Sequence, residues 1–281
     1  MHESLRVTPG FSLANVDPGS TPGTAMGKKE GTAALAAAAP EFAELQEKLF
    51  AESRHGGTRS VLLVLQAMDT AGKGGIVEHV FGALSPQGVA AYSFAAPTEE
   101  EKAHDFLWRV RKQLPQPGQL GVFDRSHYED VLIHRVRGLS SATVIEERYG
   151  LIRDFEAELV AGGTTVLKVM LHISPDEQKA RLAARLDDEA KHWKYSPGDL
   201  DERTLWPAYM EAYEIALQRT STEGAPWYVV PADHKWYARL AVQNLMLDTL
   251  RRLDPRWPVA DFDVEAEKAR LAASRTPRRS A

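Results

Sequence analysis

The sequence of 281 residues contains no cysteine, which excludes disulfides, thiolate nucleophiles and cysteine-ligated zinc or iron–sulfur centres. It also lacks a net positive charge, since 34 Lys and Arg stand against 39 Asp and Glu and give a formal net charge of −5. Such a chain has no global field that would draw it onto duplex nucleic acid, so a polyanion must find a local basic patch. Residues 1–10 lack the pattern of a secretory signal, and no apolar run approaches the roughly 18 residues of a membrane span. We therefore expect a cytoplasmic protein without duplex nucleic acid or membrane partners.

The composition is that of a globular protein, with 43% hydrophobic and 26% charged residues. Residues 8–32, however, are rich in Gly, Pro, Ser and Thr and show neither helical nor strand periodicity. A segment of this kind buries too little apolar area to offset its ordering entropy. We expect a flexible N-terminal arm over residues 1–40, one folded domain over residues 41–273 and a frayed basic tail over residues 274–281.

Short aliphatic runs, typical of strands buried on both faces, alternate along the chain with segments of helical periodicity. This order predicts an α/β fold in three layers, with a mostly parallel sheet between two layers of helices. The predicted strands are Ser60–Gln66, Val89–Phe94, Leu120–Asp124, Thr164–Ile173 and Trp227–Pro231, and the predicted helices cover about residues 42–53, 76–84, 98–114, 144–160, 174–186, 200–219 and 236–253.

The turn after the first strand, Ala67-Met-Asp-Thr-Ala-Gly-Lys73, resembles the phosphate-binding pattern G-x-x-x-x-G-K-[ST] and lies in the right context, between a buried strand and a helix. Backbone N–H groups and the positive end of the helix would face a phosphate, and Lys73 adds a mobile charge. Two residues depart from the pattern: Ala67 replaces the first glycine, and Gly74 replaces the hydroxyl residue that usually meets Mg²⁺. The predicted phosphate-binding residues of the loop are Thr70, Ala71, Gly72, Lys73, Gly74 and Gly75.

Because Gly74 cannot coordinate a metal, another ligand is needed, and Asp69 is the carboxylate inside the loop. Asp124 ends the third strand, where open α/β sheets bind ligands, and fits the acidic Mg²⁺ ligand of phosphate-loop enzymes. The alternatives are a glycine-rich turn with a solvated lysine and an ordinary strand-end carboxylate. The polar run Arg125-Ser-His-Tyr-Glu-Asp130 favours a phosphate- and metal-binding site over these alternatives. We expect Mg²⁺, with Mn²⁺ as an alternative, bound by Asp69 and Asp124.

Four stretches of the sequence together resemble the polyphosphate kinase 2 family of nucleotide phosphotransferases. They are LQAMDTAGKGG (Leu65–Gly75), GVFDRSHYEDVL (Gly121–Leu132), HISPDEQKARL (His172–Leu182) and KHWKYSPGDLDERTLWPAY (Lys191–Tyr209). Both departures in the phosphate loop are normal for that family. The resemblance implies a thymidylate-kinase-like phosphate-loop core with a helical lid at about residues 175–200. It also implies a homodimer or homotetramer that moves a terminal phosphoryl group between inorganic polyphosphate and a nucleotide with Mg²⁺.

The resemblance implies that residues of the phosphate loop and of the acidic strand end bind metal and phosphate. It also implies that the cations just after residue 180 belong to the lid. For those cations, a solvated helix face that is salt-bridged to Asp187-Asp-Glu189 is an alternative. In the implied in-line transfer, the carboxylates hold the metal and the cations offset charge on the moving group. The expected catalytic residues are Asp69, Lys73, Asp124, Arg125 and Arg181, and Arg185, Lys191 and Lys194 join the phosphate-binding set.

The form DRSHYEDVL is more similar to family members that accept both AMP and ADP than to those with a tryptophan after the serine. We therefore predict phosphorylation of AMP and ADP, or of GMP and GDP, to the di- or triphosphate, or the reverse reaction. Two other functions stay open. One is an ATP-dependent nucleotide monophosphate kinase, which shares the fold and the loop. The other is a non-catalytic nucleotide-binding regulator, against which the crowded basic segment argues.

Overall fold

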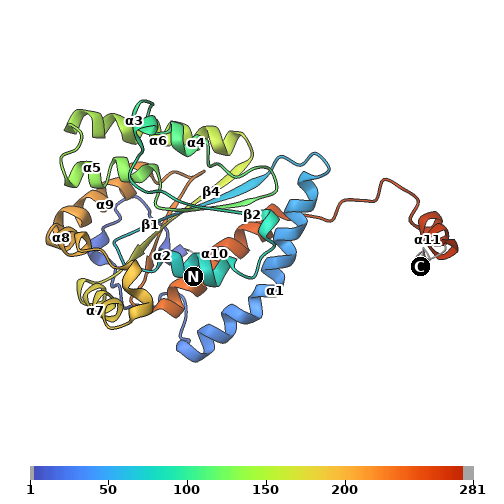
Figure 1. Ribbon diagram of the computed structural model, residues 1–281, viewed down its shortest axis with the longest axis horizontal. Helices are drawn as coiled ribbons and strands as arrows, with labels where there is room; N and C mark the ends of the chain where they lie inside the picture. Colours follow the sequence, from blue (N-terminus) through green and yellow to red (C-terminus); the bar gives the residue numbers. More distant parts are fainter. Residues whose placement is uncertain (1–2, 275–281) are drawn as a thin grey trace, which may run out of the picture.

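The computed structural model describes residues 3–274, and in this range it contains a five-stranded sheet with helices on both faces (Figure 1). Neighbouring strands of the sheet all pair in parallel, in the order β2-β3-β1-β4-β5. The predicted α/β class is confirmed, and each predicted strand is present to within one residue at either end. The strands are β1 (Ser60–Ala67), β2 (Val89–Ser93), β3 (Leu120–Asp124), β4 (Thr164–His172) and β5 (Trp227–Pro231).

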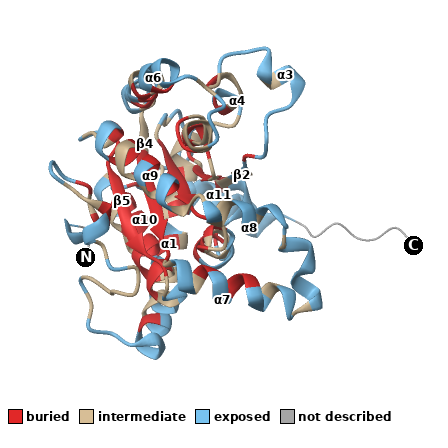
Figure 2. Ribbon diagram, turned by 90° about the vertical axis from the view of Figure 1, so that its left-hand side faces the viewer, coloured by how far each residue is buried: buried red, intermediate tan, exposed pale blue. Residues whose placement is uncertain are grey.

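Helices cover the sheet, and the buried residues lie in the strands and on the helix surfaces that face them (Figure 2). The helix α1 (Lys28–Ser53) packs along α10 (Lys235–Leu253), and α6 (Ala142–Ala161) packs on β4 and on α9 (Trp206–Thr220). The other α-helices of the described chain are α2 (Lys73–Ile76), α3 (Glu99–Lys102), α4 (Trp108–Arg111), α5 (Ile133–Val136), α7 (Pro175–Leu186), α8 (Gly198–Thr204) and α11 (Val264–Ala273).

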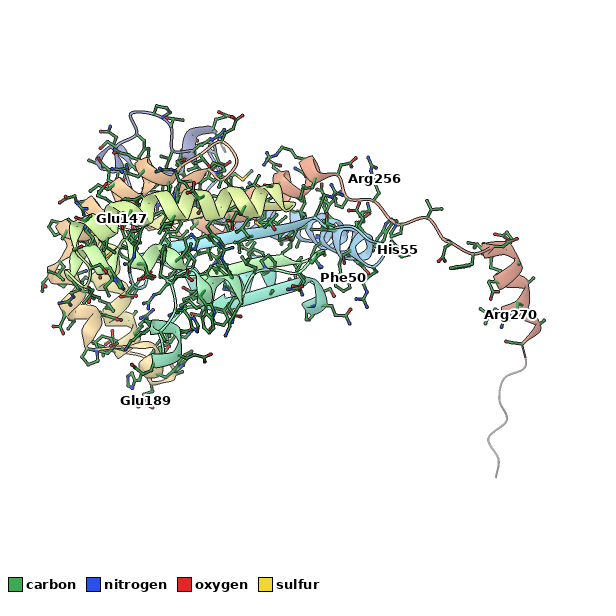
Figure 3. The ribbon with its side chains drawn as sticks, turned by 90° about the horizontal axis from the view of Figure 1, so that it is seen from above. Phe50, His55, Glu147, Glu189, Arg256 and Arg270 are labelled. Carbon is green, nitrogen blue, oxygen red and sulfur yellow. The ribbon has the colours of Figure 1, made fainter. Side chains whose placement is uncertain are left out.

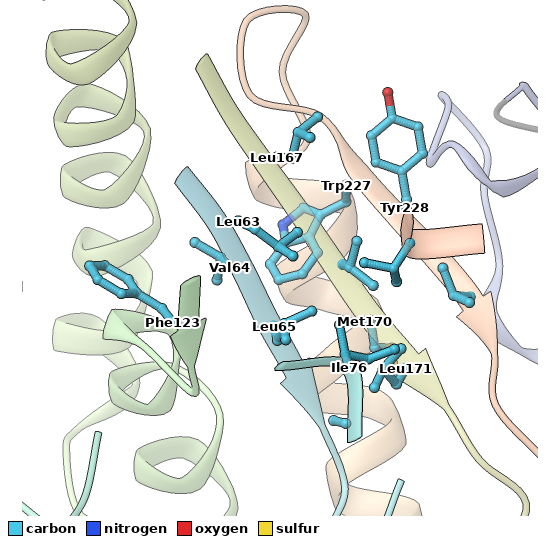
Figure 4. Close-up of a cluster of buried hydrophobic side chains, with 14 of the residues drawn as sticks. Leu63, Val64, Leu65, Ile76, Phe123, Leu167, Met170, Leu171, Trp227 and Tyr228 are labelled. Atoms are coloured by element: carbon cyan, nitrogen blue, oxygen red, sulfur yellow. The ribbon is translucent and has the colours of Figure 1, made fainter. Parts of the chain in front are cut away.

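The central strand β1 is buried along its whole length, because its neighbours β3 and β4 cover its edges and helices cover its faces. Leu63 and Leu65 are fully buried and lie in one cluster with Met170 and Trp227 (Figure 4). Burial of one such side chain stabilises the fold by about 1.5–3 kcal/mol. The parallel register places Leu65 beside Asp124. The carboxyl ends of β1 and β3 therefore meet at one edge of a rigid sheet.

The expectation of a flexible arm over residues 1–40 is wrong for residues 3–40. Leu5, Val7 and Leu13 are only 2%, 6% and 3% exposed. The N–H of Val7 donates to the carbonyl of Trp227 at 2.9 Å, beside the edge strand β5. The helix α1 begins at Lys28, well before the predicted start at residue 42. The composition argument failed because the few apolar residues of this segment pack on an existing core and need not form one of their own.

Two predicted helices are interrupted. The helix predicted over residues 98–114 is divided into α3 and α4, and a capping box of Thr98 and Glu101 opens its first part. The hydroxyl of Thr98 accepts from the N–H of Glu101 at 3.2 Å, and the Glu101 carboxylate accepts from the N–H of Thr98 at 2.8 Å. The helix predicted over residues 200–219 breaks at Leu205, between α8 and α9. Pro207 comes two residues after this break, and it has no N–H to donate to the carbonyl four residues earlier.

The C-terminal segment leaves the body of the protein. An extended link that contains Pro255 and Pro258 carries α11 away from the other helices, as the positions of Arg256 and Arg270 illustrate (Figure 3). None of the residues of α11 is buried. The body of the protein extends to Trp257, because Pro255 is buried, the N–H of Arg256 donates to Glu52 at 2.7 Å and Lys48 lies 5.9 Å from the Trp257 ring. The predicted frayed tail lies, beyond Ser274, outside the described residues. Over residues 3–274 no helix combines the length and hydrophobicity that a membrane span requires. The cytoplasmic location stays a prediction.

Candidate active site

The phosphate loop leaves β1 through two residues with left-handed backbone, Thr70 at φ +65° and Gly72 at φ +118°. Gly72 adopts this conformation without strain and is the N-cap of α2. Thr70 carries a Cβ, so its conformation costs about 1 kcal/mol or more. Strain of this kind persists only where the surrounding structure enforces it, and it clusters at ligand sites.

Lys73 lies within the loop and is only 8% exposed. Its Nζ donates to the carbonyl of Ala67 at 3.2 Å, so the residue that replaces the first glycine of the pattern holds the lysine through its backbone. Among residues 3–274 the Lys73 ammonium forms no ion pair within 4 Å. A buried cation without a counter-ion is costly, and an entering anion such as a phosphate removes that cost.

Asp69 and Asp124 meet at the carboxyl ends of β1 and β3. Arg125, directly after Asp124, has φ +64°, and its N–H donates to the carbonyl of Leu65 at 3.0 Å. Its Nη2 donates to Oδ1 of Asp69 at 2.9 Å. Two carboxylates of this kind fit Mg²⁺, which is usually bound by one or two carboxylates together with substrate phosphates and water. The described residues contain no cluster of three acidic or histidine side chains that would hold a metal by itself.

A first cavity of about 720 Å³ opens over the phosphate loop. Among the described residues its walls carry eight Lys or Arg side chains but only four carboxylates. This acidic chain therefore contains a local basic patch, which a polyanion needs in order to bind. All of the site residues predicted from the sequence line this cavity: Asp69, Thr70, Ala71, Gly72, Lys73, Gly74, Gly75, Asp124, Arg125, Arg181, Arg185, Lys191 and Lys194.

A second cavity of about 390 Å³ lies on the other side of Arg125, which lines both cavities. Its walls combine aromatic rings with cations. The guanidinium of Arg109 lies 5.0 Å from the ring of Phe94, and that of Arg148 lies 5.1 Å from the ring of Phe106. Asp130 also lines the cavity, and burial raises the pKa of its carboxyl to about 6 although Arg148 lowers it.

Comparison with known proteins decides the family. The family model described as Polyphosphate kinase 2 (PPK2) matches residues 25–257. The chain belongs to the polyphosphate kinase 2 family. The resemblance found in the sequence is thereby confirmed, and this enzyme transfers phosphoryl groups between polyphosphate and a nucleotide.

Two named relatives and a solved structure match most of the enzyme. It is 48% identical over 248 residues to the AMP/ADP-polyphosphate phosphotransferase of Meiothermus ruber. The matched region covers 88% of this chain and 91% of the relative. It is 45% identical over 229 residues to the ADP-polyphosphate phosphotransferase of Rhodopseudomonas palustris, covering 77% and 78% of the two chains. The crystal structure of polyphosphate kinase 2 from Arthrobacter aurescens TC1 matches with a TM-score of 0.95 and 62% identity, over 97% of this chain and 96% of that one.

Arg181 has a different environment from the other cations of this polyphosphate kinase. It is 7% exposed, and its guanidinium donates to protein groups only. Its partners are the Glu177 carboxylate at 2.8 Å, the carbonyls of Thr70 and Ala71 at 3.0 and 2.8 Å, and the carbonyls of Ala232 and Asp233 at 2.6 and 2.9 Å. Five hydrogen bonds use the full donor capacity of a guanidinium. Arg181 therefore holds the phosphate loop and has no donor left for a phosphate.

Of the other cations predicted for the lid, Arg185 and Lys191 line the first cavity and form salt bridges, while Lys194 lines it with its Nζ 4.9 Å from the Trp193 ring. Arg185 donates to the carbonyl of Lys194 at 2.8 Å and lies 3.4 Å from Asp199, while Lys191 lies 2.5 Å from Asp188. The alternative of a face salt-bridged to Asp187-Asp-Glu189 thus holds for Lys191 alone, because Arg185 pairs with Asp199 instead. An entering polyanion would have to compete with the carboxylates of Asp188 and Asp199.

Two cations of the first cavity were not identified from the sequence. Lys235 and Arg239 lie four residues apart at the start of α10, on the helix that follows β5. Burial lowers the pKa of both side chains, and the nearby Arg181 lowers them further. Such crowding of like charges is relieved by an anion. The signal available in the sequence was an i, i+4 pair of cations directly after a predicted strand.

Behind the second cavity lies a buried polar network. Nζ of Lys168 lies 2.5 Å from Oε2 of Glu156, and both side chains are almost fully buried. The Tyr128 hydroxyl lies 2.8 Å from Oε1 of Glu156. His127 packs against Tyr128 and Phe155, and its Nε2 lies 3.4 Å from Oε1 of Glu156. Burial lowers its pKa, so it is a neutral member of this network.

Proposed function

We propose that this enzyme transfers the terminal phosphoryl group of polyphosphate, held in the first cavity, to AMP or ADP held in the second cavity. One observation carries the proposal: Arg125 lines both cavities, so phosphates that enter from either side meet the same guanidinium. The cavities differ as the two substrates do, because cations dominate the first and aromatic rings with Arg109 and Arg148 line the second. In-line transfer requires two charged substrates end to end at such a junction.

In this proposal the chain positions the substrates and offsets charge on the moving group. The loop N–H groups and Lys73 would hold the donor phosphates, and Arg125 would neutralise the transferring group. Asp69 and Asp124 would hold Mg²⁺ or Mn²⁺, which when bound supplies positive charge against the phosphate oxygens. The attacking phosphate oxygen is already ionised and needs no general base, which is consistent with the neutral His127.

The acceptor range rests on the relatives and on the second cavity. The Meiothermus ruber relative is named for AMP and ADP, and the Rhodopseudomonas palustris relative for ADP. Phe94 and Phe106 offer apolar walls to a purine ring, and the Asp130 carboxylate can accept from its amino group. Because adenine and guanine both carry an amino group, GMP and GDP belong to the same proposal.

Within the lid expected at about residues 175–200, the part after Arg181 would close over the first cavity, because Gln178 and Arg181 hold the first part of α7 on the phosphate loop. Arg185, Lys191 and Lys194 of this segment line the cavity, and Trp193 is 78% exposed. Binding of a polyanion would exchange the ion pairs of Lys191 and Arg185 for contacts with phosphate. A closed lid excludes water from the transferring group, which suppresses hydrolysis.

The test is a product assay with purified protein, Mg²⁺ and long-chain polyphosphate, given separately with AMP, ADP, GMP and GDP and followed by ion-exchange chromatography. We expect ADP from AMP and ATP from ADP. ATP from ADP alone would restrict the enzyme to diphosphate acceptors. Transfer from ATP to a nucleoside monophosphate, without transfer from polyphosphate, would refute the donor assignment.

The enzyme would work as a homodimer or homotetramer, and the C-terminal segment supports this. Val259, Phe262 and Leu271 are 89%, 59% and 75% exposed on a segment that stands apart from the body. A ten-residue helix with no buried residue is marginal in water unless it packs on a partner. Light scattering of the full chain and of a chain that ends at residue 258 would show fewer subunits per particle for the shortened chain, and equal numbers of subunits would contradict this role of the C-terminal segment.

A further inference from the structure

Three consecutive carbonyls of the phosphate loop are held by one helix. The Asp69 carbonyl accepts from Nε2 of Gln178 at 3.1 Å, and the carbonyls of Thr70 and Ala71 accept from Arg181 at 3.0 and 2.8 Å. Gln178 and Arg181 lie three residues apart on α7 and therefore project from the same face of this helix. We call this arrangement the carbonyl clamp.

The carbonyl clamp determines where the loop N–H groups point. In a trans peptide the C=O of one residue is antiparallel to the N–H of the next, and no described peptide is cis. The N–H groups of Thr70, Ala71 and Gly72 therefore point away from α7. The Ala71 N–H closes a turn onto the Met68 carbonyl at 3.3 Å, whereas the N–H groups of Thr70 and Gly72 have no backbone partner among residues 3–274.

The clamp also accounts for the strained backbone of Thr70. This residue has φ +65° and connects two of the clamped carbonyls. Without the hydrogen bonds to α7, its peptides would be free to rotate towards a relaxed conformation, and such a rotation would turn its N–H away from the first cavity.

Arg203, on α8, determines the orientation of the Gln178 amide. Its Nη1 donates to Oε1 of Gln178 at 2.7 Å and to the Pro175 carbonyl at 2.9 Å. A guanidinium only donates and a carbonyl only accepts, so a single orientation of the amide satisfies both Arg203 and Asp69. Gln178 is 1% exposed, so water cannot replace either partner.

We propose that Gln178, oriented by Arg203, is a positioning residue that sets the affinity for polyphosphate by fixing the direction of the N–H groups in the phosphate loop. The inference rests on the proposed function, since it takes the first cavity as the polyphosphate site. Gln178 touches neither substrate in this scheme. It acts through the backbone of Asp69 and Thr70, and through them on the position of the Asp69 carboxylate.

The experiment compares Gln178→Glu and Gln178→Met with the wild type. In Gln178→Glu an oxygen replaces the amide nitrogen and repels the Asp69 carbonyl, while Arg203 keeps an acceptor. We expect the dissociation constant for tripolyphosphate, measured by calorimetry without nucleotide, to rise about tenfold, the effect of one lost hydrogen bond with an unpaired partner. Gln178→Met should raise it less, and the KM for ADP should stay within about twofold.

Gln243→Met is the matched control, because Gln243 is also 1% exposed but lies on α10 and lines a small separate cavity. It should leave the affinity for tripolyphosphate unchanged. If the Gln178 variants lose stability but bind tripolyphosphate as the wild type does, the clamp has a structural role only and the inference is wrong.

If the Gln178 variants fail to fold, Arg203→Met and Arg203→Lys test the same inference. Arg203 is partly exposed, so its substitution perturbs the fold less. Arg203→Met should weaken binding, and Arg203→Lys, which keeps a donor, should restore most of it. Equal affinities of both variants and the wild type would contradict the inference. A wild type that binds no tripolyphosphate would instead refute the proposed function, and the inference with it.

Discussion

Arg125 and Asp69 join the ends of two neighbouring strands, with Nη2 of the arginine 2.9 Å from Oδ1 of the aspartate. The pair occupies the junction between the two cavities, and Arg125 lines both of them. Burial lowers the pKa of Arg125, but the carboxylates of Glu129 and Asp69 raise it by more, so the guanidinium stays charged. When a phosphate and a metal enter, they would compete for the two members of this pair.

Arg125→Lys should lower the catalytic efficiency with both substrates. A lysine keeps the charge but cannot contact two groups through a planar fork. We expect kcat/KM to fall about 100-fold for polyphosphate and for nucleotide, measured by varying one substrate while the other is saturating. Arg185→Lys is the control, because Arg185 lines the first cavity only. A defect of Arg125→Lys confined to one substrate would place its guanidinium away from the junction.

Lys73→Met should reduce turnover about 100-fold or more while leaving the fold intact. Lys73 is buried, so methionine, which fills the space of its aliphatic stem, is a better test than alanine. The only hydrogen bond of Nζ among the described residues goes to Ala67, and its loss should lower the free energy of unfolding by less than about 1 kcal/mol. Removal of the unpaired buried charge acts in the opposite direction and stabilises the fold. Activity close to that of the wild type would mean that Lys73 is not at the transferring phosphate.

Asp124→Asn should remove the response to Mg²⁺. The amide keeps the shape of the side chain but loses the negative charge that attracts a divalent cation. We expect turnover to be lost and Mg²⁺ to cease to strengthen tripolyphosphate binding in calorimetry. A normal Mg²⁺ titration curve for this variant would refute Asp124 as a ligand.

The raised pKa of Asp130 predicts a pH dependence of stability. Its pKa in the folded protein is about 6, against an ordinary pKa of 3.8 for an exposed aspartate. Because the folded state binds this proton more tightly, the contribution is stabilising below pH 4 and is lost as the pH rises to about 6, by an amount on the order of 2–3 kcal/mol.

Asp130→Asn cannot titrate and should remove this contribution. The free energy of unfolding, measured with urea from about pH 4 to about pH 7, should fall less steeply with pH in the variant than in the wild type. Parallel curves would show that burial does not perturb Asp130. If the side chain contacts the acceptor base, the KM for ADP should also change with pH near 6 in the wild type alone.

The buried Lys168–Glu156 pair predicts a non-additive effect on stability. Lys168→Met leaves Glu156 buried without its counter-ion and should cost about 3–5 kcal/mol, as should Glu156→Leu. The double variant replaces the pair by apolar side chains and should be far closer to the wild type. Urea unfolding of the three variants measures this coupling, and additive losses would show that the ion pair itself contributes little.

The strands and the phosphate loop could be predicted because local sequence signals them directly. An unbroken aliphatic run such as Ser60–Gln66 indicates a strand covered on both faces, and the glycine-rich turn with Lys73 directly after it indicates a phosphate-binding loop. Helix ends were predicted less well. The break at Leu205 is explained by Pro207, which the sequence contains, whereas the early start of α1 at Lys28 depends on packing against α10.

The amino-acid sequence alone was enough to establish the α/β class, the five strands, the family and the identity of most residues that line the first cavity, because these depend on local periodicity and on motifs that are contiguous in the chain. The roles of those residues depend on the folded arrangement. In the folded protein Arg181 donates its hydrogen bonds to backbone carbonyls, and Lys73 is buried. Leu5 and Val7 pack into the core, and Lys235 lines the first cavity. The partner of a side chain depends on groups far away in the sequence, and only folding brings these within a few ångströms.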